Sequence, residues 1–276
     1  MKREPSLKGV FATLSDLGSA LLDLVLPADL TCAGCGARLA PGEDLVCHRC
    51  KASIVLLTEP TCARCGRPLT HRGLCRECRI SPPAFVRGWS AAIYRGPLRQ
   101  CLHRFKYDGE TRLASYLAQL LQVRLEAINA PLPTGTVVVP VPLYAARKRE
   151  RGFNQAELIA RQIASAFAFR LDPGLLYRTR PTAPQSGLAV EERLANVEGA
   201  FGARHGAGGK VILLVDDIYT TGATANAASH ALLAAGAQAV YVATVAIASS
   251  HPRPRRNESH GISSEERQGG LNNGSA

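Results

Sequence analysis

Short apolar runs alternate with amphipathic segments between residues 85 and 248. Runs of Val, Ile, Leu and Ala that are short enough for buried strands occupy Thr136–Val141, Val211–Val215 and Ala239–Ala248. Segments whose apolar residues recur at helical spacing occupy Arg112–Ile128, Gln155–Phe167 and Thr224–Ala235. Apolar strands separated by helices are typical of a parallel sheet that is covered on both faces. The pattern therefore predicts a doubly wound α/β domain over residues 85–248.

The two ends of the chain carry different patterns. In residues 1–30, apolar side chains recur at helical spacing, and we expect an amphipathic N-terminal helix there. Acidic residues interrupt this segment, so it has neither the roughly 20 apolar residues of a membrane span nor the apolar centre of a signal peptide. Residues 249–276 are polar and nearly free of apolar side chains, so we expect a disordered tail. These features predict a cytoplasmic protein without a membrane partner.

Residues 31–80 hold eight of the nine cysteines, in four C-x-x-C pairs. Two such pairs place four thiolates around one point, which is the arrangement of a structural Cys₄ zinc site. We expect two zinc ions in a double zinc ribbon, bound by Cys32, Cys35, Cys47 and Cys50 and by Cys62, Cys65, Cys75 and Cys78. Disulfides are the alternative, but they are disfavoured in a chain that shows no secretion signal. The ninth cysteine, Cys101, is expected to be an ordinary half-buried residue.

The charge of the chain is strongly positive. Its 276 residues are 46% hydrophobic, enough for a substantial core, and 33 Lys and Arg outnumber 22 Asp and Glu to give a net charge of +11. Such a surplus favours polyanionic partners such as phosphates or nucleic acid. A need for solubility would explain the positive charge equally well.

The run VILLVDDIYTTGATANA joins an expected strand to an expected helix. Asp216 and Asp217 end the strand, and a loop over Ile218–Gly222 leads into the helix. Ligands of open α/β sheets bind at this edge, where the free N–H groups of a helix N-terminus attract phosphate. Threonine hydroxyls and a close backbone approach at glycine suit a monophosphate, and the paired carboxylates suit a vicinal diol. The run therefore predicts a site for a phosphorylated ribose.

This segment resembles the phosphoribosyl-pyrophosphate loop of the type I phosphoribosyltransferases, whose α/β fold we accordingly expect behind the zinc-ribbon module. The resemblance implies that Asp216 and Asp217 hold the ribose 2- and 3-hydroxyls. The residues that it places around the 5-phosphate are Thr220, Thr221, Gly222, Ala223 and Thr224. The 6-oxopurine enzymes carry a third acid where this chain has Thr220. That departure argues against hypoxanthine or guanine as the acceptor.

Two further segments match the same class of enzyme. A basic loop after the first expected strand carries four cations that suit the pyrophosphate and its Mg²⁺, namely Arg147, Lys148, Arg149 and Arg151. The resemblance gives Arg147 and Lys148 a catalytic role beside Asp216 and Asp217, and leaves Arg149 and Arg151 to bind substrate. Residues 179–201 occupy the position of the mobile catalytic loop of the class.

The whole set of motifs resembles the ComF family, also called ComFC or GntX-like. It comprises the four cysteine pairs, FKYDG at 105–109, RGFNQ at 151–155, the Arg193–Asn196 pair and DDIYTTGAT, across residues 18–248. The resemblance implies a cytoplasmic bacterial protein that supports natural transformation. Single-stranded DNA, competence and recombination proteins, and a second copy of the chain are the partners that it suggests.

Two functions follow from these features. In the first, the chain is a phosphoribosyltransferase that uses phosphoribosyl pyrophosphate with Mg²⁺ and an acceptor that the sequence does not name. In the second, it is a non-catalytic adaptor for single-stranded DNA that uses the loop as a ligand sensor. The residues expected to contact DNA are Arg99, His103, Arg104, Lys106, Tyr107, Arg147–Arg151 and Phe153.

Overall fold

A computed structural model of the protein describes residues 31–182, 192 and 196–248. The expected helix in residues 1–30 and the expected disordered tail in residues 249–276 lie outside the described residues. Within the described part of the chain, no helix is long and apolar enough to cross a membrane.

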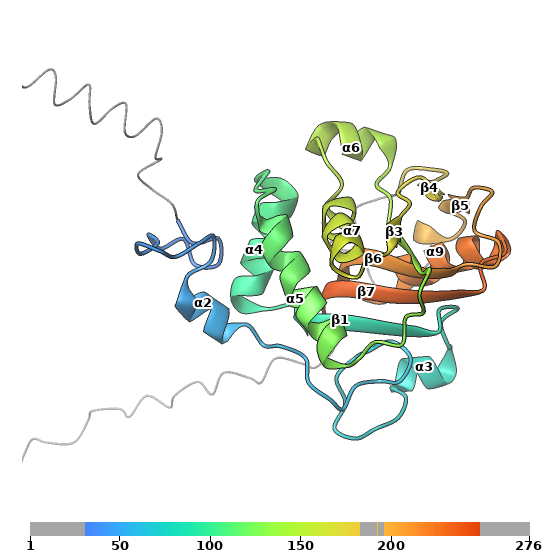
Figure 1. Cartoon of the computed structure of the whole chain (residues 1–276), viewed down its shortest axis with the longest axis horizontal. Coiled ribbons are helices and arrows are strands. Elements are labelled where there is room, and N and C mark those ends of the chain that lie inside the picture. The colour runs from blue at the N-terminus through green and yellow to red at the C-terminus, as the bar shows by residue number, and fades with distance from the viewer. Residues whose placement is uncertain (1–30, 183–191, 193–195, 249–276) are drawn as a thin grey trace, which may run out of the picture.

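A five-stranded parallel sheet forms the centre of the molecule, in the order β1-β7-β6-β2-β3 (Figure 1). In this order the strands are Arg87–Ile93, Ala239–Ile247, Val211–Tyr219, Val137–Pro140 and Arg170–Leu171. The central strand β6 is buried on both faces because its first residues are all large and apolar. The parallel sheet predicted from the apolar runs is therefore confirmed.

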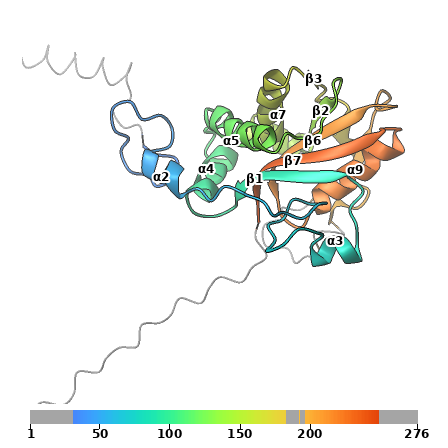
Figure 2. The same ribbon diagram turned by 60° about the horizontal axis from the view of Figure 1, so that its bottom comes forward.

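Helices cover both faces of this sheet, as Figure 2 shows. The helices are α2 His48–Ser53, α3 Arg76–Ile80, α4 Gly96–Tyr107, α5 Leu113–Ala127, α6 Ala145–Arg151, α7 Gln155–Ala166 and α9 Ala223–Ala234. Helices α4, α5 and α7 pack on one face and α9 on the other. Leu213 of β6 points into the first of these two cores and Leu214 into the second, as the alternation of a strand requires.

The two cysteine sets pack against opposite faces of the sheet domain. Cys32 and Cys50 belong to the core that contains α4, whereas Cys62 and Cys78 belong to the core that contains α9. In both cases the cysteines contribute buried apolar surface to the α/β core. Cys101 of α4 is completely buried, with 0% of its surface exposed. The expectation that it would be half-buried is therefore wrong, because α4 lies between the first cysteine set and the sheet.

Several elements differ from the sequence expectations. The basic segment that we expected to be a loop is helix α6, which ends at Gly152 in the left-handed conformation with φ of 80°. Strands β1 and β3 and helix α4 were not predicted. The antiparallel pair β4 (Leu176–Arg178) and β5 (Phe201–Ala203) flanks the expected catalytic loop, most of which lies outside the described residues.

Candidate phosphoribosyl and zinc sites

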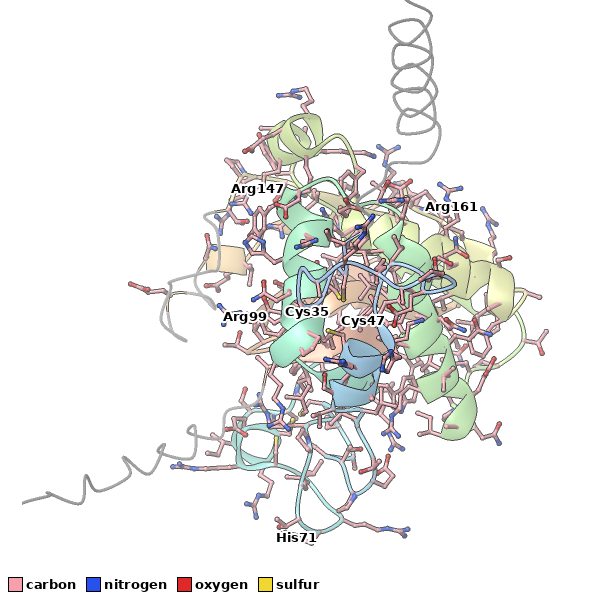
Figure 3. The ribbon with its side chains drawn as sticks, turned by 90° about the vertical axis from the view of Figure 1, so that its left-hand side faces the viewer. Cys35, Cys47, His71, Arg99, Arg147 and Arg161 are labelled. Atoms are coloured by element: carbon pink, nitrogen blue, oxygen red, sulfur yellow. The ribbon has the colours of Figure 1, made fainter. Side chains whose placement is uncertain are left out.

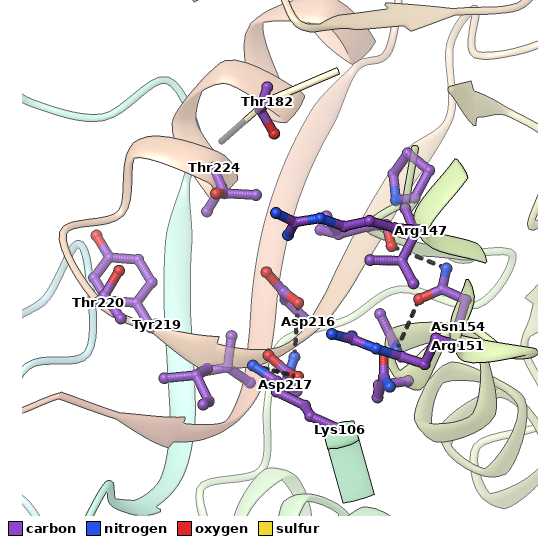
Figure 4. Close-up of a pocket in the computed structure, with 18 of the residues that line it drawn as sticks. Lys106, Arg147, Arg151, Asn154, Thr182, Asp216, Asp217, Tyr219, Thr220 and Thr224 are labelled. Atoms are coloured by element: carbon purple, nitrogen blue, oxygen red, sulfur yellow. Dashed lines mark hydrogen bonds and ion pairs between the residues drawn. The ribbon is translucent and has the colours of Figure 1, made fainter. Parts of the chain in front are cut away.

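A cavity of about 420 Å³ opens at the carboxyl end of β6 (Figure 4). Strand β6 delivers two acids to it, α9 begins at its edge, and α4, α6 and β4 supply cations. Among the predicted site residues, those that line it are Arg147, Arg151, Asp216, Asp217, Thr220, Gly222 and Thr224. The cavity thus brings together the acids, the loop that we predicted to bind phosphate (residues 220–224, called the phosphate loop below) and part of the basic segment. These come from distant parts of the sequence.

The two acids occupy different environments. Asp217 is 7% exposed, and its Oδ2 forms a 2.8 Å ion pair with Nζ of Lys106 in α4. Asp216 is half-buried, and its Oδ1 accepts a 2.8 Å hydrogen bond from the Asp217 backbone N–H. Burial, followed by the charge of Asp217, raises the pKa of Asp216 to about 7. The carboxylate of Asp217 is therefore held by a cation, whereas the neighbouring Asp216 titrates near neutral pH.

Lys106 is a site residue whose role the sequence did not reveal. We expected it on a DNA-binding surface, but it lies in the cavity, with 22% of its side chain exposed. Burial alone would lower its pKa, but the Asp217 carboxylate outweighs burial and raises the pKa above its usual value. The FKYDG motif was the available signal, since its lysine ends a helix that points toward the acids.

The phosphate loop owes its shape to Gly222. This residue caps the N-terminus of α9 with φ of 86°, in the left-handed region that favours glycine. A Cβ at this position would lie 2.6 Å from Cζ of Tyr219 and nearer still to its hydroxyl. Thr221 Oγ1 accepts a 3.3 Å hydrogen bond from the Ala223 backbone N–H, whereas Thr220 and Thr224 line the cavity. The loop therefore presents hydroxyls and a helix N-terminus to the cavity.

Cations line the opposite side of the acids from the loop (Figure 4). Arg151 donates a 2.8 Å hydrogen bond to Gln155 and stacks 5.3 Å from the centroid of Tyr107. Lys148 turns away and pairs with Glu157 at 3.4 Å, and neither Lys148 nor Arg149 lines the cavity. Because α6 is helical, its basic side chains point in several directions, and only some of them reach the site.

Arg178 of β4 is a second site residue that the sequence did not reveal. Its Nε donates a 2.9 Å hydrogen bond to the Pro142 carbonyl, and its Nη1 donates a 2.6 Å bond to Thr182 Oγ1. The guanidinium also lies 4.7 Å from the centroid of Phe201. These contacts hold a fixed cation at the cavity wall. No motif marks this arginine, because the fold alone brings β4 beside the acids.

The predicted cysteine sets form two Cys₄ clusters, in each of which all ligand sulfurs lie within 4.8 Å of one another. The Cys35 and Cys47 sulfurs are 3.9 Å apart, and those of Cys65 and Cys75 are 3.7 Å apart. Tetrahedral zinc with Zn–S bonds of about 2.3 Å requires a separation of about 3.8 Å. Cys32 Sγ also accepts hydrogen bonds of 3.3 Å from the backbone N–H groups of Gly34 and Cys47. Both clusters fit structural zinc.

One protein family and several known proteins are similar in sequence to this chain. Residues 21–79 match the family described as the double zinc ribbon domain. The chain is 35% identical over 217 residues to the DNA utilization protein YhgH of Escherichia coli K12, covering 76% of this chain and 94% of that protein. It is 31% identical over 201 residues to the competence protein ComFC of Bacillus subtilis, covering 70% of this chain and 80% of that protein.

A third relative and one solved structure also match this chain. Competence protein F of Haemophilus influenzae is 29% identical over 217 residues, covering 76% of this chain and 94% of that protein. A Bacillus subtilis glutamine phosphoribosylpyrophosphate amidotransferase matches with a TM-score of 0.31 and 22% identity, covering 49% of this chain and 26% of that one. By its sequence relatives and its double zinc ribbon, the chain belongs to the ComF family.

Proposed function

We propose that the chain binds phosphoribosyl pyrophosphate with Mg²⁺ in the cavity at the end of β6. The supporting observation is the order of groups across this cavity: the helix N-terminus and threonines, then the paired acids, then the arginines. A 5-phosphate, a ribose diol and a pyrophosphate follow one another in the same order along the ligand. Asp216 and Asp217 accept hydrogen bonds from the two ribose hydroxyls, and the loop at Gly222 receives the 5-phosphate.

The cations on the far side of the acids suit the pyrophosphate. Arg147, Arg151 and Arg178 surround that part of the cavity, and Arg178 is already fixed by its own hydrogen bonds. Mg²⁺ prefers carboxylate and phosphate oxygens, so it fits a site with two acids, and when bound it would neutralise pyrophosphate charge. In this arrangement the arginines stabilise negative charge on the leaving pyrophosphate, and the acids stabilise positive charge that develops on the ribose.

The corresponding reaction is transfer of the phosphoribosyl group to an acceptor. The bond between the anomeric carbon and the pyrophosphate oxygen breaks, its electrons leave with pyrophosphate, and an acceptor atom bonds to the same carbon. Since the relatives are named for DNA utilization and competence, we infer that this activity serves the uptake or use of DNA.

Isothermal titration calorimetry with phosphoribosyl pyrophosphate and Mg²⁺ tests this proposal. We expect one ligand per chain, with binding that competes with ribose 5-phosphate at the loop. A protein that carries zinc and is folded, yet shows no heat of binding with or without Mg²⁺, would refute it.

The affinity for this ligand should rise with pH. Asp216, whose pKa is about 7, faces Asp217, Lys106 and Arg178, and it accepts a ribose hydrogen bond best as a carboxylate. Its raised pKa means that it is protonated below neutrality, so we expect affinity to fall roughly tenfold from about pH 8 to about pH 6. The Asp216→Asn variant is the control, because its residual dependence on pH reports the titration of the ligand alone. Identical slopes for the two proteins would contradict the assignment.

The second candidate function is an adaptor for single-stranded DNA. The observation that favours it is a set of exposed cations that includes Arg99 and Lys148, together with Tyr107, which is 62% exposed. Figure 3 shows Arg99 and Arg147 on the same side of the molecule as Cys35 of the first cysteine cluster. Such a surface suits a phosphate backbone, with an aromatic ring available for stacking.

Salt dependence tests the adaptor. Affinity for single-stranded DNA should fall steeply between about 50 and 200 mM salt. Replacing Arg147, Lys148, Arg149 and Arg151 by alanine should reduce the slope of log affinity against log salt by about 3, since each phosphate contact contributes about 0.7. Arg161→Ala, which removes an exposed cation of α7, should leave the slope unchanged. Absence of binding at low salt would assign the positive charge to solubility.

A further inference from the structure

The second cysteine cluster is connected to the phosphate loop by one arginine. Arg67 follows Cys65 by two positions, and its Nη2 donates to the Thr220 carbonyl while its Nη1 donates to the Ala248 carbonyl, each at 3.4 Å. Ala248 in turn donates its backbone N–H to the Tyr219 carbonyl at 2.8 Å. A single guanidinium therefore ties the start of the phosphate loop to the segment that follows β7.

The cluster that carries Arg67 is itself held rigidly on the sheet. A Cβ at Gly66 would lie 2.5 Å from the Gly88 carbonyl oxygen, so the two backbones are in direct contact. The Gly88 backbone N–H donates a 2.7 Å hydrogen bond to the Arg64 carbonyl. Because this turn cannot shift without disturbing β1, the backbone that carries the Arg67 side chain is held in place.

The loop also rests on side chains of the same core. Tyr219 packs edge to face on Phe85 with ring centroids 6.4 Å apart, and both belong to the core that contains Cys62 and Cys78. The ring of Tyr219 lies against Gly222, the residue whose conformation shapes the loop. The loop is therefore held both by the packing of Tyr219 in this core and by the hydrogen bonds of Arg67 from the second cluster.

We propose that the second zinc ribbon is a built-in support for the phosphate loop and that Arg67 is the positioning residue that transmits it. Zinc on Cys62, Cys65, Cys75 and Cys78 then organises a ligand site that no zinc-bound atom contacts. The inference deepens the proposed function and rests on it for the identity of the ligand. The support itself can be measured without any ligand. Thr220 and Tyr219 are linked through Arg67 to the turn that zinc closes, so loop order depends on the metal.

The test compares Arg67→Met with Arg64→Met in the full-length protein. Arg64 lies in the same turn, and its Nη2 donates a 3.2 Å hydrogen bond to the Pro83 carbonyl rather than to a carbonyl of the loop. For Arg67→Met we expect amide hydrogen exchange over residues 220–224 to become about tenfold faster. We also expect the affinity for phosphoribosyl pyrophosphate with Mg²⁺ to fall about tenfold, which corresponds to about 1.4 kcal/mol. Arg64→Met should change neither, and both variants should retain their zinc.

The two readouts separate the two claims. Unchanged exchange over residues 220–224 in a zinc-loaded Arg67→Met protein would overturn the support. Faster exchange together with a wild-type protein that binds no phosphoribosyl pyrophosphate would uphold the support and refute the proposed function. If Arg67→Met fails to fold, Arg67→Lys replaces it, because lysine keeps the charge but cannot span two carbonyls as the guanidinium does. Exchange like that of wild type in Arg67→Lys would then contradict the role of the paired hydrogen bonds.

Discussion

Purified protein should contain two zinc ions per chain, and loss of either should destabilise the whole molecule. The two Cys₄ clusters have sulfur separations of 3.7 and 3.9 Å, close to what tetrahedral zinc requires. Apparent binding free energies of structural zinc, about 10–16 kcal/mol in peptides, are comparable to the total stability of a typical domain, about 5–15 kcal/mol. The clusters also belong to the two cores of the sheet domain. We therefore expect a chelator to lower the melting temperature of the α/β domain as well.

Single substitutions make this expectation specific. Cys78→Ser should leave one zinc per chain, whereas Cys101→Ala, at a buried cysteine outside both clusters, should leave two. Elemental analysis gives the stoichiometry, and far-ultraviolet circular dichroism gives the melting temperature with and without chelator. Anaerobically prepared protein that contains no zinc, or whose unfolding is unaffected by complete removal of zinc, would show that the clusters are not structural metal sites.

Local patterns predicted the centre of the fold well. The apolar run Val211–Val215 identified β6, but the strand continues to Tyr219 because Asp216, Ile218 and Tyr219 also pair with β7. Strand β1 escaped prediction because its sequence, RGWSAAI, lacks a β-branched run, and its buried residues other than Trp89 are small. The basic segment was read as a loop from its charge, yet AARKRER consists of residues with high helix propensity.

The candidate site was predictable only in part, for a physical reason. The acids and the phosphate loop are contiguous in sequence, so one motif contains them. The partners of these groups come from elsewhere: Lys106 from α4, Arg178 from β4 and Arg67 from the second cysteine cluster. Lys106 and Arg178 lie in the connections between strands of the central sheet, and Arg67 reaches the loop because the second cysteine cluster packs on the sheet. A local sequence pattern does not reveal contacts of this kind.

Replacing Asp217 by asparagine should have the largest effect on the proposed ligand. Asparagine keeps the shape but loses the charge, and a hydrogen bond to a charged group contributes about 1.5–3 kcal/mol. We therefore expect the affinity for phosphoribosyl pyrophosphate to fall roughly 10- to 150-fold. The variant should also lose stability, because it leaves Lys106 largely buried without its ion-pair partner. Removing one partner of a fully buried pair costs about 3–5 kcal/mol, and the 22% exposure of Lys106 reduces this to about 2 kcal/mol.

A second variant separates the effect on binding from the effect on folding. Lys106→Met combined with Asp217→Asn removes both members of the pair, so the stability lost in Asp217→Asn should largely return. Its affinity should nevertheless stay well below that of Lys106→Met alone, because the ribose still lacks a carboxylate acceptor. Calorimetry and thermal unfolding of the wild type, the two single variants and the double variant give the complete thermodynamic cycle. If the double variant binds phosphoribosyl pyrophosphate as tightly as Lys106→Met does, Asp217 serves only to neutralise Lys106. The ribose would then have to be held by Asp216 alone.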